Sequence, residues 1–384
     1  MWATALSVAV MIISIAVVLG FKETIKDKMF VFWGHIEIAP FNANPGTIIS
    51  PSPFEKDNQL IKNISKNQEV VSVYPYLIKP TILQADSLME GLKIKGVDAN
   101  YPFKSNDAIQ FEGNPISFDS ENYAQQIIVS KNTLNKINKN IGDSLLVYFL
   151  NPDQAYPRVR KLQIAGTFHT GMDEIDANFA ISDIQLLQRV SNWDSTQING
   201  YQVEIKDYNL SNFVAYQLYQ DYLEPPMSAS TMQDIYPNIF SWLDLMNRNT
   251  YIILIIMAIV AVINLSTALL IFILERTPMV GVLKTLGMPM KKIKRIFQIH
   301  ASKIAIKGIL WGNLAGVGFC LIQKYTHIIQ LDESAYYMSF VPIQLIFWHV
   351  LLVNIFTFLF CLVILNLPLL ILKKINIIQA IKFK

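Results

Sequence analysis

The chain has 384 residues, of which 52% are hydrophobic and 16% are charged, and its formal net charge at pH 7 is +3. The mean hydropathy is positive, at +0.33, although a long stretch in the middle of the chain is polar, so the composition favours a membrane protein with a large aqueous domain. The two cysteines, Cys320 and Cys361, both fall in apolar stretches, which excludes a disulfide framework for the polar part.

Four apolar stretches are long enough to cross a membrane, because a hydrocarbon core of about 30 Å needs about 20 helical residues. The first has neither a basic start nor a small-residue cleavage site, so we expect a retained membrane helix rather than a cleaved signal peptide. None contains Asp or Glu, which argues against a proton- or sodium-driven transporter. Polar residues inside them, such as Asn264 and Asn354, are expected to face other helices. The four stretches are Trp2–Gly20, Tyr251–Leu274, Ile304–Ile322 and Ile343–Leu372.

Charge is divided unevenly along the chain. Residues 21–248 hold 19 basic and 26 acidic side chains, a net charge of −7, so a whole-chain charge of +3 leaves +10 for the remainder. The positive charge lies mainly in residues 275–303 and 373–384. Because Lys and Arg are enriched in cytoplasmic segments, both are predicted to be cytoplasmic and residues 21–248 to lie on the opposite side.

The polar part is predicted to be an α+β domain, and roughly 225 residues bury an adequate core without disulfides. The order of its elements, β-α-β-β…β-α-β, fits a ferredoxin-like split βαβ unit with an insertion at about 99–198 that consists mostly of strands. The elements of the unit are a helix at Glu23–Phe32, a strand at Gly34–Ala39, a helix at Asp57–Asn67, strands at Val70–Ala85, Leu92–Val97 and Tyr201–Lys206, a helix at Leu210–Tyr222 and a strand at Met227–Met232. The strands of the insertion are Gln126–Val129, Leu145–Leu150, Lys161–Phe168 and Phe179–Ile181.

Apolar residues at helical spacing flank this domain next to the first and the second apolar stretch. Two interpretations stay open, because a helical moment does not name its partner: the two helices pair as a stalk, or each packs separately on the domain. The residues are Phe21, Ile25, Met29 and Phe32 on one side, and Ile235, Ile239, Phe240, Trp242, Leu243, Leu245 and Met246 on the other.

The segment between the second and third apolar stretches, Ile273–Phe297, is basic, and its apolar residues recur at helical spacing. The pattern predicts an amphipathic helix broken at Gly287 and Pro289. A segment that only fixes topology would explain the charge, whereas a structured cationic helix suggests a partner on that side of the membrane. The charged residues are Glu275, Arg276, Lys284, Lys291, Lys292, Lys294 and Arg295, and the periodic apolar residues are Val280, Leu283, Leu286, Ile293, Ile296 and Phe297.

The chain carries no familiar catalytic or nucleotide-binding motif. The strings G-x-x-x-x-G-K-[ST], H-E-x-x-H, C-x-x-C and G-x-S-x-G are all missing, so no enzyme activity is expected. Basic and aromatic residues of the polar part do not cluster, so no nucleic-acid partner is expected. The nearest approach to a metal site is His169 with Asp173, Glu174 and Asp176, which we interpret as a solvated acidic surface loop without a metal.

The string E-R-x-x-x-x-G-x-L-K-x-L-G at 275–287, followed by a basic helix, resembles the signature of the FtsX-type permease domain of ABC transporters. Other strings are similar to the lipoprotein-releasing (LolC/LolE-type) permeases, so that the resemblance covers almost the whole chain. They are SVAVMIISIAVVLGFKETIKDKM at 7–29 with GHIEI at 34–38, LQIAGTFHTGMDEIDANFAISDIQLLQRV at 162–190, LDESAYYMSFVPI at 331–343, and the tail LPLLILKKINIIQAIKFK at 367–384, which lacks the family's second proline.

The resemblance implies a membrane protein with four transmembrane α-helices and a large α+β periplasmic domain, made of a porter-like ferredoxin-type unit and a mostly β, sabre-like insertion. It also favours the stalk for the flanking helices. The basic segment would dock on a separate ABC ATPase dimer that holds ATP and Mg, leaving no cofactor in this chain. The residues expected to couple to the ATPase are Glu275, Arg276, Gly281, Leu283, Lys284, Leu286, Gly287, Lys291, Lys292 and Arg295.

The other partners implied are a second permease copy or a paralogue, membrane lipid, a lipoprotein substrate and a periplasmic lipoprotein carrier. In one of the two paralogues a long loop before the G-T-F string hooks the carrier, but the matching stretch here, 151–160, is short, so carrier recruitment stays open. Such permeases begin with a basic cytoplasmic segment, so the true start is expected to be missing. The carrier-contact candidates are Asn151, Pro152, Tyr156, Pro157 and Arg158.

The expected function is extraction of lipoproteins from the bacterial inner membrane, where the chain is placed by the resemblance. Two others stay open: an FtsX-like regulator of periplasmic cell-wall hydrolases, and a split MacB-like exporter of peptides. Acyl chains need an aliphatic wall, expected at Ile15, Val18, Leu19, Ile252 and Ile256, although contact with annular lipid would explain the same residues. The expected boundaries are 1–20 (first span), 21–248 (periplasmic domain), 249–274 (second span), 275–303 (coupling region), 304–372 (third and fourth spans) and 373–384 (cytoplasmic tail).

Overall fold

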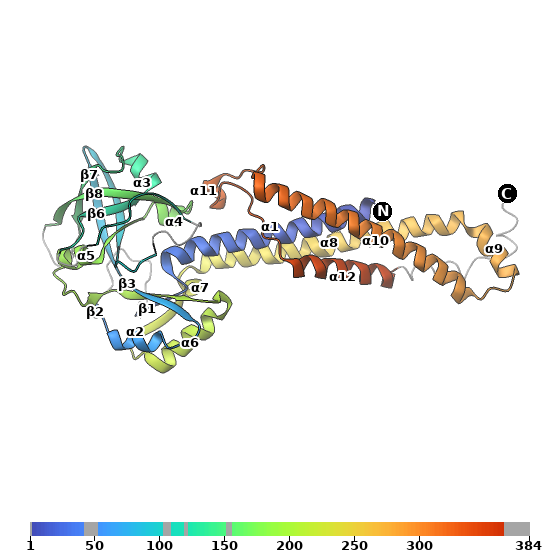
Figure 1. Ribbon diagram of the computed structural model, residues 1–384, viewed down its shortest axis with the longest axis horizontal. Helices are drawn as coiled ribbons and strands as arrows, with labels where there is room; N and C mark the ends of the chain where they lie inside the picture. The colour runs from blue at the N-terminus through green and yellow to red at the C-terminus, as the bar shows by residue number, and fades with distance from the viewer. Residues whose placement is uncertain (1, 42–52, 103–108, 119–121, 151–155, 365–384) are drawn as a thin grey trace. The chain divides into compact units, whose positions relative to one another are not determined.

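The computed structural model describes residues 2–41, 53–102, 109–118, 122–150 and 156–364 (Figure 1). The chain divides into two compact units. One, which we call the helical unit, comprises residues 1–23, 241–330 and 340–384. The other, the sheet unit, comprises residues 24–240 and 331–339.

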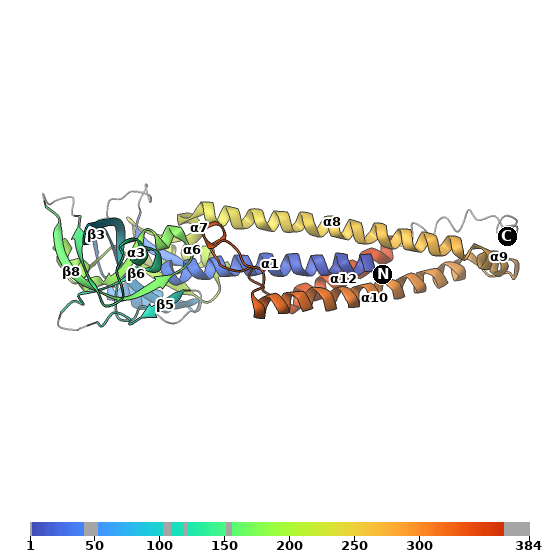
Figure 2. The same ribbon diagram turned by 90° about the horizontal axis from the view of Figure 1, so that it is seen from above.

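Long helices make up the helical unit, and in both views they run alongside one another (Figures 1 and 2). Among the described residues, three helices are long and apolar enough to cross a membrane. The last helix is shorter, and residues 365–372 of its predicted span lie outside the described residues. The helices are α1 (Trp2–Trp33), α8 (Pro237–Glu275), α9 (Thr277–Thr285), α10 (Met290–Thr326) and α12 (Phe347–Ile364).

Three boundaries differ from those that the sequence predicts. The helix expected at Glu23–Phe32 is not separate, because α1 runs through it without a break. The helix before the second span begins at Pro237 and continues as α8. The span predicted at Ile304–Ile322 is only part of α10, which begins at Met290. Hydropathy alone divides such a helix where charge begins, although the backbone hydrogen bonds do not stop there.

Small residues bring α1 and α10 close together. A Cβ atom at Gly312 would lie 2.7 Å from the carbonyl oxygen of Ala5, and one at Gly316 would lie 3.0 Å from the Cα atom of Ala9. Such close approach is how small residues promote helix packing in membranes. Between α10 and α12, the side chains of Asn313 and Asn354 exchange two hydrogen bonds of 2.8 and 3.0 Å, so Asn354 faces another helix as predicted.

The first half of the sheet unit has the predicted split βαβ order. Its strands lie in the order β12-β1-β11-β3, and every neighbouring pair is antiparallel. The helices α2 and α6 lie next to each other below these strands in Figure 1. The elements are β1 (Ile36–Pro40), α2 (Asn58–Ile64), β3 (Val70–Ala85), β11 (Gly200–Ile205), η1 (Tyr208–Leu210), α6 (Ser211–Tyr222), β12 (Met227–Thr231) and α7 (Met232–Ile235).

The insertion shares strand β3 with the first half instead of forming a separate sheet. The first part of β3 pairs with β11, whereas residues 77–85 pair with β4. The pairings β3–β4, β4–β9, β9–β6, β6–β8, β8–β7 and β7–β3 then close into a ring. A closed ring leaves these strands few free edges. The strands are β4 (Leu88–Val97), β5 (Gln110–Gly113), β6 (Gln126–Ser130), β7 (Ser144–Phe149), β8 (Arg158–His169) and β9 (Phe179–Asp183), with the separate pair β2 (Phe54–Glu55) and β10 (Gln197–Ile198).

Short helices in the insertion were missed by the sequence prediction. Each of the two longest follows a strand directly, and the last strand residue caps it: Ser130 accepts a hydrogen bond from the backbone N–H of Thr133, and Asp183 from that of Gln185. Side-chain caps of this kind fix where a helix begins. The helices are α3 (Lys131–Lys136), α4 (Asp173–Asp176) and α5 (Ile184–Ser191), and α11 (Glu333–Tyr336) lies in the loop between α10 and α12.

Candidate functional site

The candidate coupling site is the turn between α9 and α10. The break predicted at Gly287 and Pro289 is present, since α9 ends at Thr285 and α10 begins at Met290. Gly287 has a φ of +80°, a left-handed conformation that glycine adopts without cost. The backbone N–H of Gly287 donates to the carbonyl of Lys284 at 3.0 Å, and that of Met288 to the carbonyl of Leu283 at 3.0 Å. These bonds satisfy carbonyl groups that the end of α9 leaves free.

A small apolar core holds the turn in place. Phe272 of α8 stacks on His300 of α10, with ring centroids 4.4 Å apart and an angle of 5° between the rings. Leu283, expected to contact the ATPase, is half-buried against this core, and Gly281 is buried. The core residues are Ile273, Val280, Ile293, Phe297, Ala301, Ala305 and Cys361. The turn is therefore a supported structure and not a loose tether.

One face of α9 exposes apolar side chains. Leu286 is 77% exposed, Val282 is 53% exposed and Met279 is 38% exposed. Their spacing of three and four residues places them on one side of the helix. Met279 and Val282 were missed by the sequence analysis, but counting back from Leu286 in helical steps would have found them. The cations Arg276, Lys291, Lys292 and Arg295, and the carboxylate of Glu275, are also exposed, on the segments just before and after α9.

This arrangement has a definite chemical character. Exposed apolar side chains are usually scattered, whereas a cluster rimmed by charge marks an interaction site. Positive charge around an apolar centre suits a groove with an apolar floor and an acidic rim. Of the apolar residues and glycines among the expected coupling residues, the structure leaves Leu286 and Gly287 exposed, and it places Leu283 and Gly281 in internal packing.

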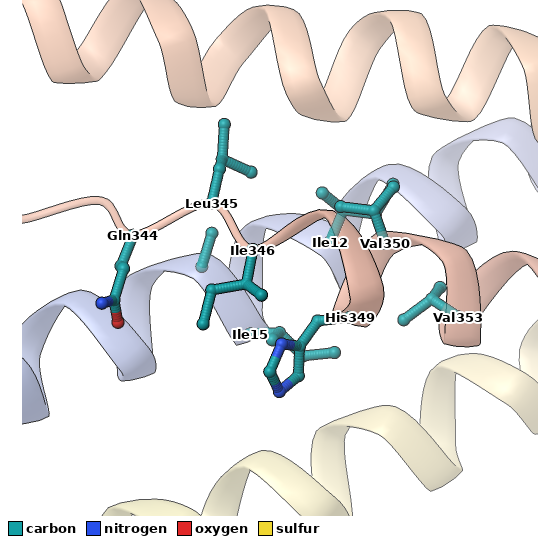
Figure 3. A pocket seen from close by; sticks show the side chains of 9 residues that line it. Ile12, Ile15, Gln344, Leu345, Ile346, His349, Val350 and Val353 are labelled. Atoms are coloured by element: carbon teal, nitrogen blue, oxygen red, sulfur yellow. The ribbon is translucent and has the colours of Figure 1, made fainter. Parts of the chain in front are cut away.

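The candidates for an acyl-chain wall differ in exposure. Ile15 lines a small cavity between α1 and α12, where the ring of His349 also points (Figure 3). Its volume of about 10 Å³ holds roughly one water molecule, so an acyl chain does not fit. Val18 and Leu19 are half-buried on α1. Ile252 and Ile256 are 55% and 49% exposed on α8.

Helix α8 has one face toward its own unit and one face without a partner in the described residues. Leu254 and Met257 pack against a small core, which we call the α1 core. It consists of Val8, Met11 and Ile12 of α1 and Val353 of α12. In the helical unit, the Nζ of Lys22 on α1 also donates a 3.1 Å hydrogen bond to Asn247 Oδ1 on α8. The other face presents aliphatic side chains to the surroundings, at Ile252, Ile253, Ile255, Ile256, Ile259 and Ile263.

The end of α1, from residue 24, and the start of α8, up to Phe240, belong to the sheet unit and pack within it. The ring of Phe240 at the start of α8 stacks on Tyr208 with centroids 5.9 Å apart. Tyr208 also contacts Phe30 of α1, at 4.6 Å between centroids. With the contact between Lys22 and Asn247 in the helical unit, these helices both lie alongside each other and pack on the domain. The two interpretations drawn from sequence are therefore not exclusive.

A buried charge network anchors the end of α1. The Nζ of Lys95 on β4 donates to the carbonyl oxygen of Phe32 and, at 2.6 Å, to Gln202 Oε1. Three ring centroids, of Phe32, Trp33 and Tyr101, lie within about 5 Å of it. Burial lowers the pKa of Lys95 to about 7 and raises that of Glu37 to about 7. When it is protonated, Lys95 places a positive charge at the C-terminal end of α1, where it interacts favourably with the helix dipole and stabilises the helix.

The remaining predictions concern the carrier-contact loop and a metal site. Among the carrier-contact candidates, Tyr156 is exposed, and Arg158 donates a 3.0 Å hydrogen bond to the carbonyl of Arg189. Asn151 and Pro152 lie outside the described residues. Nowhere in the described parts of the chain do three or more His, Cys, Asp or Glu side chains gather to hold a metal ion.

The interpretation of residues 173–176 as a solvated surface loop is wrong for Asp176. Its side chain is fully buried and accepts hydrogen bonds from the backbone N–H groups of Thr170 and Gly171 and from the Thr170 hydroxyl. An aspartate is usually exposed, which is why exposure was predicted from residue type. Here three hydrogen-bond donors supply the partners that the buried carboxylate of Asp176 needs.

Family models match most of the chain. A MacB-like periplasmic core domain matches residues 1–213, and an FtsX-like permease C-terminal model matches residues 251–377. The lipoprotein-releasing system transmembrane protein LolC of Xylella fastidiosa strain Temecula1 is 22% identical over 369 residues, which cover 91% of this chain and 85% of that protein. LolE of Haemophilus influenzae is 21% identical over 365 residues, with the same coverage.

Among solved structures, the periplasmic region of MacB from Actinobacillus actinomycetemcomitans is similar to 53% of this chain and 91% of that chain. The identity is 15% and the TM-score is 0.37, a likeness too weak to add to the family matches.

Proposed function

Because the chain belongs to the family of ABC transporter permeases that join a MacB-like periplasmic core domain to an FtsX-like C-terminal module, we propose that it releases lipoproteins from the inner membrane. Members of this family are multi-pass inner-membrane proteins, and this chain accordingly has apolar helices and a periplasmic domain. They act in complexes with an ATPase partner and are not enzymes themselves. The specific substrate and partners of this chain are the proposal.

In the proposed topology four helices cross the membrane and both ends of the chain are cytoplasmic. The charge of −7 on residues 21–248, against +10 on the remainder, supports this orientation. The α9–α10 turn is then on the cytoplasmic side, and the sheet unit, with its sabre-like insertion, lies in the periplasm.

The observation that carries the coupling role is the exposed face of α9. Met279, Val282 and Leu286 present an apolar patch on a turn that is held by its own core. A rigid patch passes on the movement of a bound partner, whereas a flexible loop would absorb it. We therefore assign this face, with the cations beside it, to the ATPase subunit. ATP and Mg belong to that subunit.

The proposed substrate rests on the LolC and LolE relatives, whose names describe a lipoprotein-releasing system, and on the free aliphatic face of α8. Because the cavity beside Ile15 is too small for an acyl chain, we place the acyl site between two permease subunits. One wall is the α8 face that includes Ile252 and Ile256. Each methylene that leaves water for such a wall contributes about 0.8 kcal/mol.

Photo-crosslinking tests the proposed substrate. A photoreactive residue at Ile256 of the nucleotide-free complex, reconstituted with a triacylated lipoprotein, is expected to crosslink to the lipoprotein and not to its deacylated form. The control is the same residue at Leu254, which packs against the α1 core and is expected to give no such crosslink. Crosslinks from Ile256 to phospholipid alone would contradict the proposal, and would favour a regulator of cell-wall hydrolases or an exporter of peptides.

A further inference from the structure

The loop between α10 and α12 is part of the sheet unit. Residues 331–339 belong to that unit, although the chain on both sides of them belongs to the helical unit. The backbone N–H of Leu331 donates to the carbonyl of Ser339 at 2.9 Å, which closes the base of the loop. We call residues 331–339 the latch loop.

One imidazole joins the latch loop to the rest of the sheet unit. At the end of β8, His169 places its Nε2 3.0 Å from Glu333 Oε1 of the latch loop. Its Nδ1 lies 2.9 Å from Oδ2 of Asp176. Asp176 is itself fixed by hydrogen bonds from Thr170 and Gly171. Burial raises the pKa of Asp176, and these hydrogen bonds and the charge of His169 oppose that rise.

Two further contacts and one glycine complete the docking of the latch loop. The hydroxyl of Tyr337 donates a 2.9 Å hydrogen bond to Glu174 Oε1, and Lys28 Nζ donates one of 2.6 Å to the carbonyl of Tyr337. Gly171 has a φ of +70°, and a Cβ atom there would collide with the side chain of Glu333. The loop therefore sits on the sheet unit at a distance that only glycine permits.

We propose that the latch loop is a proton-sensitive device, closed on the sheet unit while the imidazolium of His169 bridges Asp176 and Glu333. A protonated ring carries a positive charge beside both carboxylates, although Nδ1 has no hydrogen-bond partner among the described residues. A neutral ring carries no charge, and one of its nitrogens presents a lone pair. Loss of the proton therefore removes the charge attraction between the ring and both carboxylates and turns a lone pair toward one of them. The loop is therefore expected to open when the imidazole loses its proton.

The other charged groups around the imidazole do not supply the same effect. Lys28 of α1 lies near both carboxylates and attracts each of them. Asp173 and Glu174 come from α4, and Glu174 is occupied by Tyr337. His169 is the histidine whose two ring nitrogens both face carboxylates. The proposed opening of the latch loop does not depend on which substrate is transported. It can therefore be tested independently of the proposed function.

Hydrogen–deuterium exchange of the full-length chain in lipid nanodiscs tests the latch. Protection of the amides in residues 331–339, corrected for the intrinsic effect of pH, is expected to be about tenfold greater at pH 6 than at pH 8, the size expected for one charge-assisted hydrogen bond. The strands β7 and β10 contain no histidine and no group with a pKa near 7, and they serve as the reference in the same unit. Equal protection of the loop at the two pH values would overturn the proposal.

Variants connect the effect to the named imidazole. His169→Gln keeps hydrogen-bonding groups but does not titrate, so the ratio between pH 6 and pH 8 is expected to fall to about that of the reference strands. The matched control, His300→Gln, removes a histidine of α10 and is expected to keep the full ratio. If His169→Gln does not fold, Glu333→Gln replaces it and is expected to lower protection at pH 6 toward the pH 8 level. A full ratio in either variant would also overturn the proposal.

Discussion

The burial of Lys95, which is fully buried, is a property of a single residue that the sequence does not reveal. The strand prediction placed Lys95 correctly, but Lys93, two residues earlier in the same strand, has the same residue type and is only half-buried. The groups that make burial of Lys95 tolerable, the carbonyl of Phe32 and the side chain of Gln202, are distant along the chain. A buried charge needs partners of this kind. Only the fold brings them together, so no local pattern could mark Lys95.

His35 gives a prediction about pH. Its Nδ1 accepts a 3.1 Å hydrogen bond from the backbone N–H of Ile205, and burial lowers the pKa of His35 to about 4. In the unfolded chain an imidazole binds a proton near pH 6.5. The unfolded state therefore binds more protons between pH 6.5 and 4, so the stability that neutral His35 contributes above pH 6.5 is lost as the pH falls toward 4.

Chemical denaturation of the sheet unit within the full-length chain, followed at pH 7 and pH 4.5, measures this loss. We expect His35 to account for a fall of at most about 3 kcal/mol. His35→Asn keeps a hydrogen-bond acceptor without the titration and is expected to reduce the fall. An unchanged fall in that variant would show that other groups cause it.

At the scale of elements, apolar runs and alternation predicted most helices and strands. The strand at Val70–Ala85 is confirmed residue by residue. Short helices such as α3 and α5 escaped because their few residues carry a weak periodic signal. The exposed face of α9 was half found: Leu286 was named, but Met279 and Val282 were not, because exposure depends on which side of α9 meets the core of α8 and α10.

The contact between α1 and α10 gives a second prediction at this scale. Gly312→Ala places a Cβ atom against the carbonyl of Ala5, which forces the two helices apart. Such overpacking is expected to cost about 1–3 kcal/mol and to lower the thermal unfolding temperature of the detergent-solubilised chain. Gly318→Ala is the matched control, because a Cβ atom there meets nothing within 4 Å. Equal unfolding temperatures for both variants would contradict this packing.

For the whole molecule, the sequence predicted an α+β domain inserted between apolar helices, and the family matches agree with that description. It did not predict that strand β3 is common to the two halves of the sheet unit, nor that the loop at 331–339 belongs to that unit. Both depend on pairings between distant segments. Residue periodicity reports the type of an element and says little about its partner.

The central claim is that the α9 face couples this permease to an ABC ATPase. It is tested most directly by the rate of lipoprotein-stimulated ATP hydrolysis in a reconstituted complex that carries Val282→Asp together with Leu286→Asp. Two charges in an apolar contact are expected to lower that rate at least about tenfold, while the control Leu88→Asp, an exposed leucine of the sheet unit, retains it. Normal co-purification of the ATPase with the double variant, together with a normal rate, would contradict the account.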